Sequence, residues 1–119
     1  MHNFKELKVW QLSIAFSKFV FEIIKDFPSE HKFGIADQLF RCSVSIPSNI
    51  AEGCGRKSDK EFSQFVSISL GSAFEIETQI IIAKEVKLIT EEQFNNLSHK
   101  ILEIQKMLHG LLKNLNNKK

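Results

Sequence analysis

Long apolar-periodic stretches with few chain breakers are the feature that most limits what this chain can fold into. The 119 residues contain only 2 prolines and 5 glycines, so few turns interrupt the periodic segments. Apolar residues recur at steps of three and four, the spacing of one side of an α-helix. No alternation typical of hairpin strands is present. The sequence therefore predicts an all-α protein of a few long helices, in one domain spanning residues 1–119.

The first two helices are delimited by proline and glycine. The first is expected over Lys5–Phe27, because the residue before Pro28 is disfavoured in the α conformation. The second is expected over Ile35–Cys54, entered through Gly34 and left through Gly53 and Gly55.

The last two helices begin at capping boxes. Ser58 with Glu61 starts a helix that runs to about Val86, and Thr90 with Gln93 starts one that runs to about Leu115. Small residues in the middle of the third helix allow close approach of a neighbour. We expect an up-down four-helix bundle with short connections. The apolar seam of the third helix comprises Phe62, Val66, Ser69, Ala73, Ile76, Ile80 and Ala83, and that of the fourth comprises Phe94, Leu97, Ile101, Ile104, Leu108, Leu111 and Leu115.

The first helix carries two apolar stripes. Residues 7 and 9 lie about 200° apart around a helix, so stripes that begin there occupy opposite sides. A helix that is apolar on both sides is normally buried on both. A wide core face with some exposed phenylalanines is one explanation. Self-association through this helix is the favoured one, because a large apolar patch is rare on a soluble monomer. The stripes comprise Leu7, Trp10, Ile14, Phe21 and Ile24, with Ser17 in register, and Val9, Leu12, Phe16, Phe19, Ile23 and Phe27.

The second helix contains a proline and a polar stripe. Pro47 removes one backbone N–H and leaves the carbonyl of Ser43 without its helical donor. Because the apolar stripe keeps its register across Pro47, we favour a continuous helix kinked there over two helices, the second with proline in its first turn. The polar stripe is either a hydrogen-bond network that orders the bundle or a contact for a ligand or partner. It comprises Arg41, Ser45, Asn49, Glu52 and Arg56, beside an apolar stripe of Leu39, Cys42, Ile46 and Ile50.

A phosphate-binding loop is excluded, although the stretch GCGRKS resembles the end of one. That motif needs G-x-x-x-x-G-K-[ST] between a strand and a helix. Aligned on Lys57 and Ser58, this sequence has Arg56 and Ala51 at the glycine positions, and no strand precedes them.

Other catalytic and metal-binding patterns are equally weak. Cys42 and Cys54 have no zinc-ligand spacing, and we interpret them as reduced thiols rather than as a disulfide. Glu75 and Glu77 are two residues apart and point to different sides of a helix, so they form no acid/base pair. Glu75 either pairs with Arg41 or meets solvent. The sequence therefore predicts no enzyme, no metal and no cofactor.

Location and charge add little to this. The N-terminus lacks the apolar core of a signal peptide, and no apolar run is expected to reach membrane-spanning length. We therefore expect a cytoplasmic protein with no membrane contact. The net charge of +2 does not by itself imply a nucleic-acid partner.

Three stretches carry a resemblance to a known family: FKELKVW near the start, the segment 27–56 with its string SIPSNIAEG, and GSAFEIET at 71–78. Together they resemble the bacterial four-helix-bundle proteins encoded in intervening sequences of 23S ribosomal RNA genes. That family is similar in turn to the accessory variability determinant of diversity-generating retroelements. The resemblance implies a four-helix protomer assembled as a ring-shaped homopentamer. For the retroelement relative it also implies binding to nucleic acid and to a reverse transcriptase, whereas no activity is defined for the intervening-sequence proteins.

The family signature can be carried over residue by residue. The chain departs from it at Phe40-Arg41-Cys42, where family members often have Arg-Arg-Ala, which removes one positive charge from a candidate nucleic-acid face. The signature falls on Gln38, Arg41, Ser45, Pro47, Asn49, Glu52, Gly53, Arg56, Gly71, Ser72 and Glu75.

Basic residues define the candidate nucleic-acid contacts. The last twenty residues hold five lysines and one acid, and a further cluster lies around the turn before the third helix. Both are also compatible with an ordinary solvated surface. In a pentamer each site would occur five times, so weak contacts would add up. The predicted contacts are Arg41, Arg56, Lys57, Lys60 and Lys113.

Two function classes follow. The first is a nucleic-acid-associated homo-oligomer that acts on structured RNA, on DNA or on a ribonucleoprotein. The second is a protein-interaction scaffold that docks a partner such as a reverse transcriptase.

Overall fold

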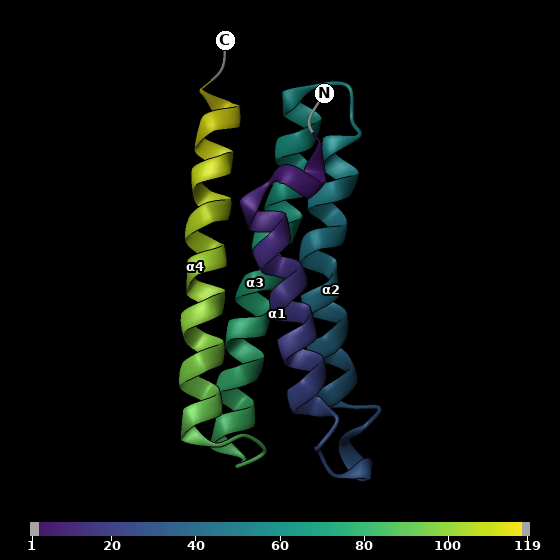
Figure 1. The fold of residues 1–119 in the computed structure, drawn as a ribbon, viewed down its shortest axis with the longest axis vertical. Coiled ribbons are helices and arrows are strands. Elements are labelled where there is room, and N and C mark those ends of the chain that lie inside the picture. Colours follow the sequence, from purple (N-terminus) through teal and green to yellow (C-terminus); the bar gives the residue numbers. More distant parts are fainter. Residues whose placement is uncertain (1–2, 118–119) are drawn as a thin grey trace.

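Caps and turns set the limits of the helices in the computed structural model, which describes residues 3–117 (Figure 1). The described chain is all-α, with four α-helices, two short 3-10 turns and no strand, as predicted. The elements are η1 (Phe4–Glu6), α1 (Lys8–Ile24), η2 (Ser29–His31), α2 (Ile35–Cys54), α3 (Asp59–Glu85) and α4 (Glu91–Asn116).

The predicted bounds are confirmed for α2 and wrong for the first helix. The extended backbone of Leu7 separates η1 from α1, so the α-helix begins at Lys8 rather than at Lys5. It also ends at Ile24, because Phe27 donates its N–H to the Ile24 carbonyl in a turn rather than continuing the helix. Gly53 does not end α2, which continues to Cys54.

Both predicted capping residues start their helices. The Ser58 hydroxyl accepts the Glu61 N–H at 3.1 Å. At α4 the box is reciprocal: Thr90 Oγ1 accepts the Gln93 N–H at 3.0 Å, and the Gln93 side chain accepts the Thr90 N–H at 2.9 Å. These bonds satisfy N–H groups that lack a partner inside the helix.

The end of α3 is set by a non-glycine residue in the left-handed region. Lys87 has φ 66°. Its N–H bonds to the Lys84 carbonyl, and the Leu88 N–H reaches back to the Ala83 carbonyl at 2.8 Å. This is a Schellman ending, which usually places glycine at that position. The chain thus turns sharply from α3 into α4.

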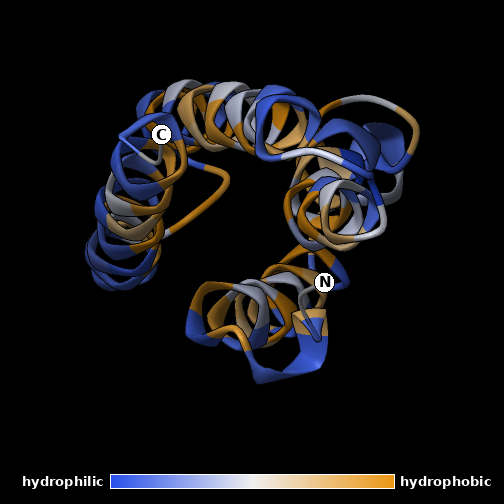
Figure 2. Cartoon of the chain, turned by 90° about the horizontal axis from the view of Figure 1, so that it is seen from above, coloured by the Kyte–Doolittle hydropathy of each residue, from blue (hydrophilic) through white to orange (hydrophobic). Residues whose placement is uncertain are grey.

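The helices run alternately up and down around a common interior (Figures 1 and 2). α3 packs extensively on both α2 and α4, and α1 packs mainly on α2. The contact between α1 and α4 is smaller. α1 is therefore held chiefly from one side.

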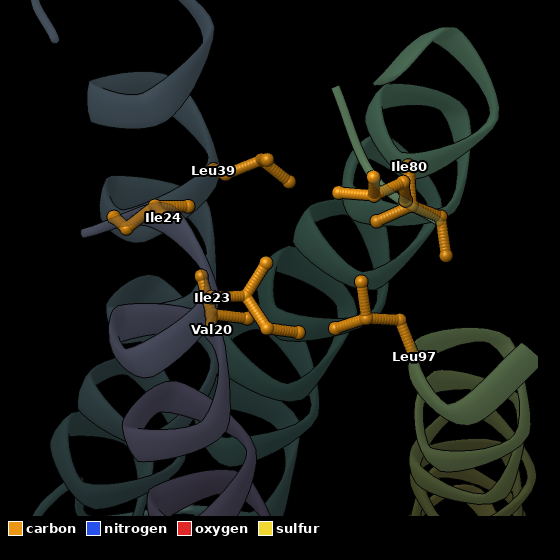
Figure 3. A pocket seen from close by; sticks show the side chains of 7 residues that line it. Val20, Ile23, Ile24, Leu39, Ile80 and Leu97 are labelled. Atoms are coloured by element: carbon orange, nitrogen blue, oxygen red, sulfur yellow. The ribbon is translucent and has the colours of Figure 1, made fainter. Parts of the chain in front are cut away.

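The core lies where the sequence predicted it for α3 and α4. All seven residues of the α3 seam are buried, and so are five of the seven on α4. At the end of the bundle that holds the α3–α4 turn, the apolar side chains surround a cavity of about 10 Å³ (Figure 3). It offers no polar group to a ligand. Its lining residues are Val20, Ile23, Ile24, Leu39, Ile80, Ile89 and Leu97.

α2 is continuous through Pro47, so the alternative of two separate helices is wrong. A kink at Pro47 stays a prediction. Pro47 itself is buried. The neighbouring carbonyl of Ile46 accepts a hydrogen bond from the Ser69 hydroxyl on α3 at 2.9 Å, which ties α3 to α2 beside the proline.

One expectation about membranes is revised. α3 is long and apolar enough to cross a membrane by length and composition alone, contrary to the prediction that no run would reach that length. Within its apolar window 39% of the residues are buried inside the bundle. The apolar character of α3 thus combines a core seam with further apolar residues on its outer side.

Candidate nucleic-acid interface

The α2–α3 turn and the first turn of α3 hold three of the five predicted contact residues. Arg56, Lys57 and Lys60 are all exposed. The Arg56 guanidinium lies 4.7 Å from the centre of the Phe65 ring and donates to Glu52 Oε2 at 2.8 Å. A guanidinium that lies over an aromatic ring keeps its charge and loses mobility. Arg56 is therefore a positioned cation, and the two lysines beside it are free to move in solvent.

Acidic residues balance this turn locally. Glu52, Asp59 and Glu61 lie in the same segment as the three basic residues, so the formal charge of 52–61 is zero. Glu52 is bonded to Arg56, and the Glu61 backbone is bonded to the Ser58 cap. The turn alone is not a strongly positive surface.

The wider end of the bundle is more basic than the turn. The start of η1, the start of α1 and the last turn of α4 lie at the same end as the α2–α3 turn (Figure 1). Lys113, the fourth predicted contact, belongs to this end. We name its exposed cations the basic end: Lys5, Lys8, Arg56, Lys57, Lys60 and Lys113.

Charge is distributed unequally along the bundle. The six cations of the basic end are accompanied by four acids, Glu6, Glu52, Asp59 and Glu61, which leaves a formal excess of two positive charges. The opposite end has a formal excess of two negative charges. Its five cations are Lys25, Lys32, Arg41, Lys84 and Lys87, and its seven acids are Glu22, Asp26, Glu30, Asp37, Glu85, Glu91 and Glu92. Lys118 and Lys119, part of the predicted lysine-rich end, lie outside the described residues.

Arg41, the fifth predicted contact, is not part of the basic end. It lies thirteen residues before Cys54, the last residue of α2, which is about 20 Å along the helix axis at 1.5 Å per residue, and Arg56 lies beyond that end. Its side chain is 77% exposed and pairs with Asp37 Oδ2 at 2.9 Å. The alternative partner considered for it, Glu75, lies instead within 4.0 Å of the Cys42 sulfur.

The middle of the polar stripe forms a hydrogen-bond cluster between α2 and α3. The hydroxyls of Ser45 and Ser72 are 2.9 Å apart. Asn49 donates its side-chain N–H to the Ser45 carbonyl at 2.8 Å and lies 3.0 Å from the Ser45 hydroxyl. These signature residues therefore join two helices, as the network interpretation predicts, and the charged ends of the stripe face solvent.

The two signature glycines have opposite surroundings. A Cβ on Gly53 would lie 2.7 Å from a ring carbon of Phe62 and 2.9 Å from the Phe65 Cβ. Gly53 thus lets α3 approach α2 closely. A Cβ on Gly71 would meet nothing within 4 Å, since Gly71 is exposed on the outer side of α3.

Neither thiol is activated. Burial raises the pKa of Cys42 above its ordinary value, with a smaller opposing effect from the Gln79 hydrogen bond and a smaller raising effect from Glu75. Burial also raises the pKa of Cys54. Both cysteines are free, as predicted. Within residues 3–117 there is no cluster of three or more His, Cys, Asp or Glu side chains suited to a metal ion.

Several contacts were not predicted. Asp37 bonds to Arg41, and Phe65 lies under Arg56. The Asp37–Arg41 pair could have been predicted from the i, i+4 spacing of the two residues. Lys5 and Lys8 join the basic end only because α1 folds back along α2. Both lysines are far in sequence from the α2–α3 turn, so the sequence did not indicate that they lie at the same end of the bundle.

Comparison with known proteins identifies a family and a solved structure of similar fold. The family model described as 23S rRNA-intervening sequence protein matches residues 5–110. A crystal structure of a protein of unknown function from the S23 ribosomal protein family of Bacteroides thetaiotaomicron VPI-5482 superposes with a TM-score of 0.82 and 28% identity. The match covers 88% of this chain and 95% of that one. No curated protein matches.

Proposed function

This chain belongs to the 23S rRNA-intervening sequence protein family, and we propose that it is a non-enzymatic homo-oligomer that associates with RNA through its basic end. The observation that carries the proposal is the unequal charge along the bundle. Phosphate binding depends on Lys and Arg side chains that neutralise phosphates. Among the described residues, the six exposed cations of the basic end form a cluster of positive charge that could neutralise RNA phosphates.

The arrangement at the α2–α3 turn supports this role. Arg56 is held over Phe65, while Lys57 and Lys60 extend into solvent. A fixed guanidinium positions a phosphate, and mobile lysines add charge without sequence readout. The contact is therefore expected to follow RNA shape and backbone rather than base sequence.

Assembly compensates for the small charge of one protomer. We propose a ring-shaped homopentamer, as the family resemblance implies. An excess of two charges gives weak binding, but five copies on one ring engage one RNA together. Affinity then depends on the number of basic ends that contact the same molecule.

Fluorescence anisotropy with a labelled RNA hairpin tests the proposal. If each bound site makes about three phosphate contacts, affinity falls about 20-fold or more between about 50 mM and about 200 mM salt. The double variant Lys57→Glu/Lys60→Glu is expected to lose at least that much affinity at the lower salt concentration. A matched control, Lys84→Glu/Lys87→Glu, makes the same charge change at the opposite end of the bundle and is expected to have a much smaller effect.

Three results contradict the proposal. Binding that does not respond to salt, or equal losses in the two double variants, removes the basic end as the contact. Absence of binding to RNA and to DNA, together with recovery of one specific protein such as a reverse transcriptase after nuclease treatment, supports the scaffold function instead.

A further inference from the structure

α1 and α2 together form an apolar groove on the outside of the bundle. Its upper part, of about 310 Å³, is lined by Phe4, Trp10, Ile14, Val44, Pro47 and Ala51. Its lower part, of about 480 Å³, continues past the Phe21 and Phe40 rings, whose centres are 5.7 Å apart. We name the two parts together the α1–α2 groove. It contains one of the two apolar stripes that the sequence places on the first helix.

A second apolar surface lies on the outer side of α3. Its large residues are between 45% and 60% exposed. Neither α2 nor α4 buries it, although the Phe74 ring lies 6.3 Å from the ring of His109 on α4. We name it the α3 outer face: Ile68, Gly71, Phe74, Ile81, Ile82 and Val86.

Gly71, at the centre of this face, is exposed, and a Cβ added there would meet nothing within 4 Å inside the protomer. Glycine is unfavourable in a helix interior, and this one touches no side chain that would require it. A missing side chain between Ile68 and Phe74 leaves a notch in the ridge. Such a notch lets another surface approach the helix backbone closely.

We propose that the α3 outer face of one protomer docks into the α1–α2 groove of a second copy. This rests on the proposed self-association and names the two surfaces that carry it. Each surface is too apolar to remain exposed in water without a partner. Because the two surfaces are different, the contact is head-to-tail, and repeated head-to-tail contacts close into a ring when the rotation allows it.

The two surfaces match in level along the bundle. The Ser45–Ser72 and Ile46–Ser69 bonds place the middle of α2 beside residues 69–72 of α3. The upper groove, which includes Val44 and Pro47, therefore lies level with Gly71. A neighbouring copy related by rotation about an axis along the bundle presents its α3 outer face at the same level.

Their charges are also complementary. Lys25, Lys32 and Arg41 line the lower part of the groove together with Asp37, which is bonded to Arg41. These four residues leave an excess of two positive charges on the groove. At the corresponding level the α3 outer face is bordered by two exposed acids, Glu75 and Glu85. Opposite charges across an interface favour the correct pairing and register. Arg41, which is not part of the basic end, thus has a place in the assembly.

The first test uses the open space at Gly71. Gly71→Gln places a side chain where the protomer has room, so circular dichroism should show unchanged helical content. The same side chain fills the notch, and sedimentation at micromolar concentration should show a shift to monomer, with association weakened at least 10-fold. Ile14→Glu in the groove should do the same. The matched control Leu102→Glu, at an exposed apolar residue of α4 outside both surfaces, should keep the native assembly.

Mixing the two monomeric variants tests the head-to-tail pairing. Gly71→Gln keeps an intact groove, and Ile14→Glu keeps an intact α3 outer face. Their equimolar mixture should form a one-to-one dimer and nothing larger. A mixture that stays monomeric, or a Gly71→Gln variant that assembles like the native chain, overturns the pairing. A native chain that is itself monomeric overturns the proposed self-association as well, so the two failures are distinguishable.

Discussion

The contact between α2 and α3 and the outer side of α1 are both apolar, but they are built differently. The α2–α3 contact combines a buried seam with Gly53, which admits the Phe62 ring, and with hydroxyls that bond across the helices. The outer side of α1 has large apolar residues such as Ile14 and Phe21 that remain about half exposed. The α2–α3 contact therefore stabilises the protomer, whereas the outer side of α1 is available for assembly.

The largest expected effect is on stability, and it comes from replacing phenylalanine by alanine in each of the two regions. Phe62→Ala removes a ring that is 2% exposed and should lower the free energy of unfolding by about 3–5 kcal/mol. Phe21→Ala, at a side chain that is 52% exposed, should cost less than about 1 kcal/mol. Urea unfolding in an Ile14→Glu background measures both without the contribution of assembly. Equal losses would contradict the division into two regions.

Gly53 gives the next largest effect. Gly53→Ala forces a Cβ to within 2.7 Å of the Phe62 ring, and overpacking of this kind costs about 1–3 kcal/mol. Gly110→Ala on α4 is the matched control, because its Cβ would meet nothing within 4 Å. There the gain in helix propensity should raise stability by up to about 1 kcal/mol. Thermal unfolding of the two variants should therefore shift in opposite directions; a shift in the same direction would refute the close approach at Gly53.

A smaller effect is expected from the hydroxyls between the helices. Ser69→Ala leaves the Ile46 carbonyl without its hydroxyl donor in a buried contact, at a cost of about 1 kcal/mol. Ser63→Ala removes a hydroxyl that bonds only to the Lys60 carbonyl of its own helix, and should change stability by less than about 0.5 kcal/mol. Denaturant midpoints of the two variants measure the difference. Identical midpoints would mean that the Ser69 bond adds nothing.

The smallest effect is a pH dependence from the thiols. Burial raises the folded-state pKa of Cys54 above its ordinary value of 9.0. The folded state therefore favours the neutral thiol. Its contribution to stability is complete below the unfolded pKa and is lost as pH rises through the raised folded pKa. Comparison of the native chain with Cys54→Ala between pH 8 and pH 10 should show a larger loss in the native chain, because the variant keeps only the contribution of Cys42. Slow alkylation of Cys54 at pH 8 should accompany it.

Local signals predicted most of the protomer. The capping residues Ser58 and Thr90 act within their own helices, so the sequence alone predicted where α3 and α4 begin. In the same way, the apolar periodicity of these helices predicted which of their residues face the core. The end of α3 was predicted to within one residue. The turn that follows was not predicted, because its left-handed position is occupied by Lys87 rather than by glycine. The first helix was predicted too long, because periodicity continues through Leu7 while the backbone there is extended.

The candidate site depended on information that periodicity does not carry. The stripe was predicted to lie on one helix, but α2 ends at Cys54, so Arg56 lies in the turn that follows and is separated in space from Arg41. Which distant residues join each end is decided by the packing of α1 and α4. The start of α1 and the last turn of α4 are examples, since they lie at the same end of the bundle as the α2–α3 turn only through tertiary folding (Figure 1). Similarly, the two apolar stripes on α1 predicted that this helix is apolar on two sides, but they did not indicate which helices or copies of the chain cover each side.

Sedimentation velocity of the native chain at micromolar concentration tests the central claim most directly, because it asks whether the outer side of α1 is covered by further copies. The account predicts a single closed assembly of five protomers, each of 13.7 kDa, that loses this state when Ile14 is changed to glutamate. A native chain that sediments as a 13.7 kDa monomer would contradict it.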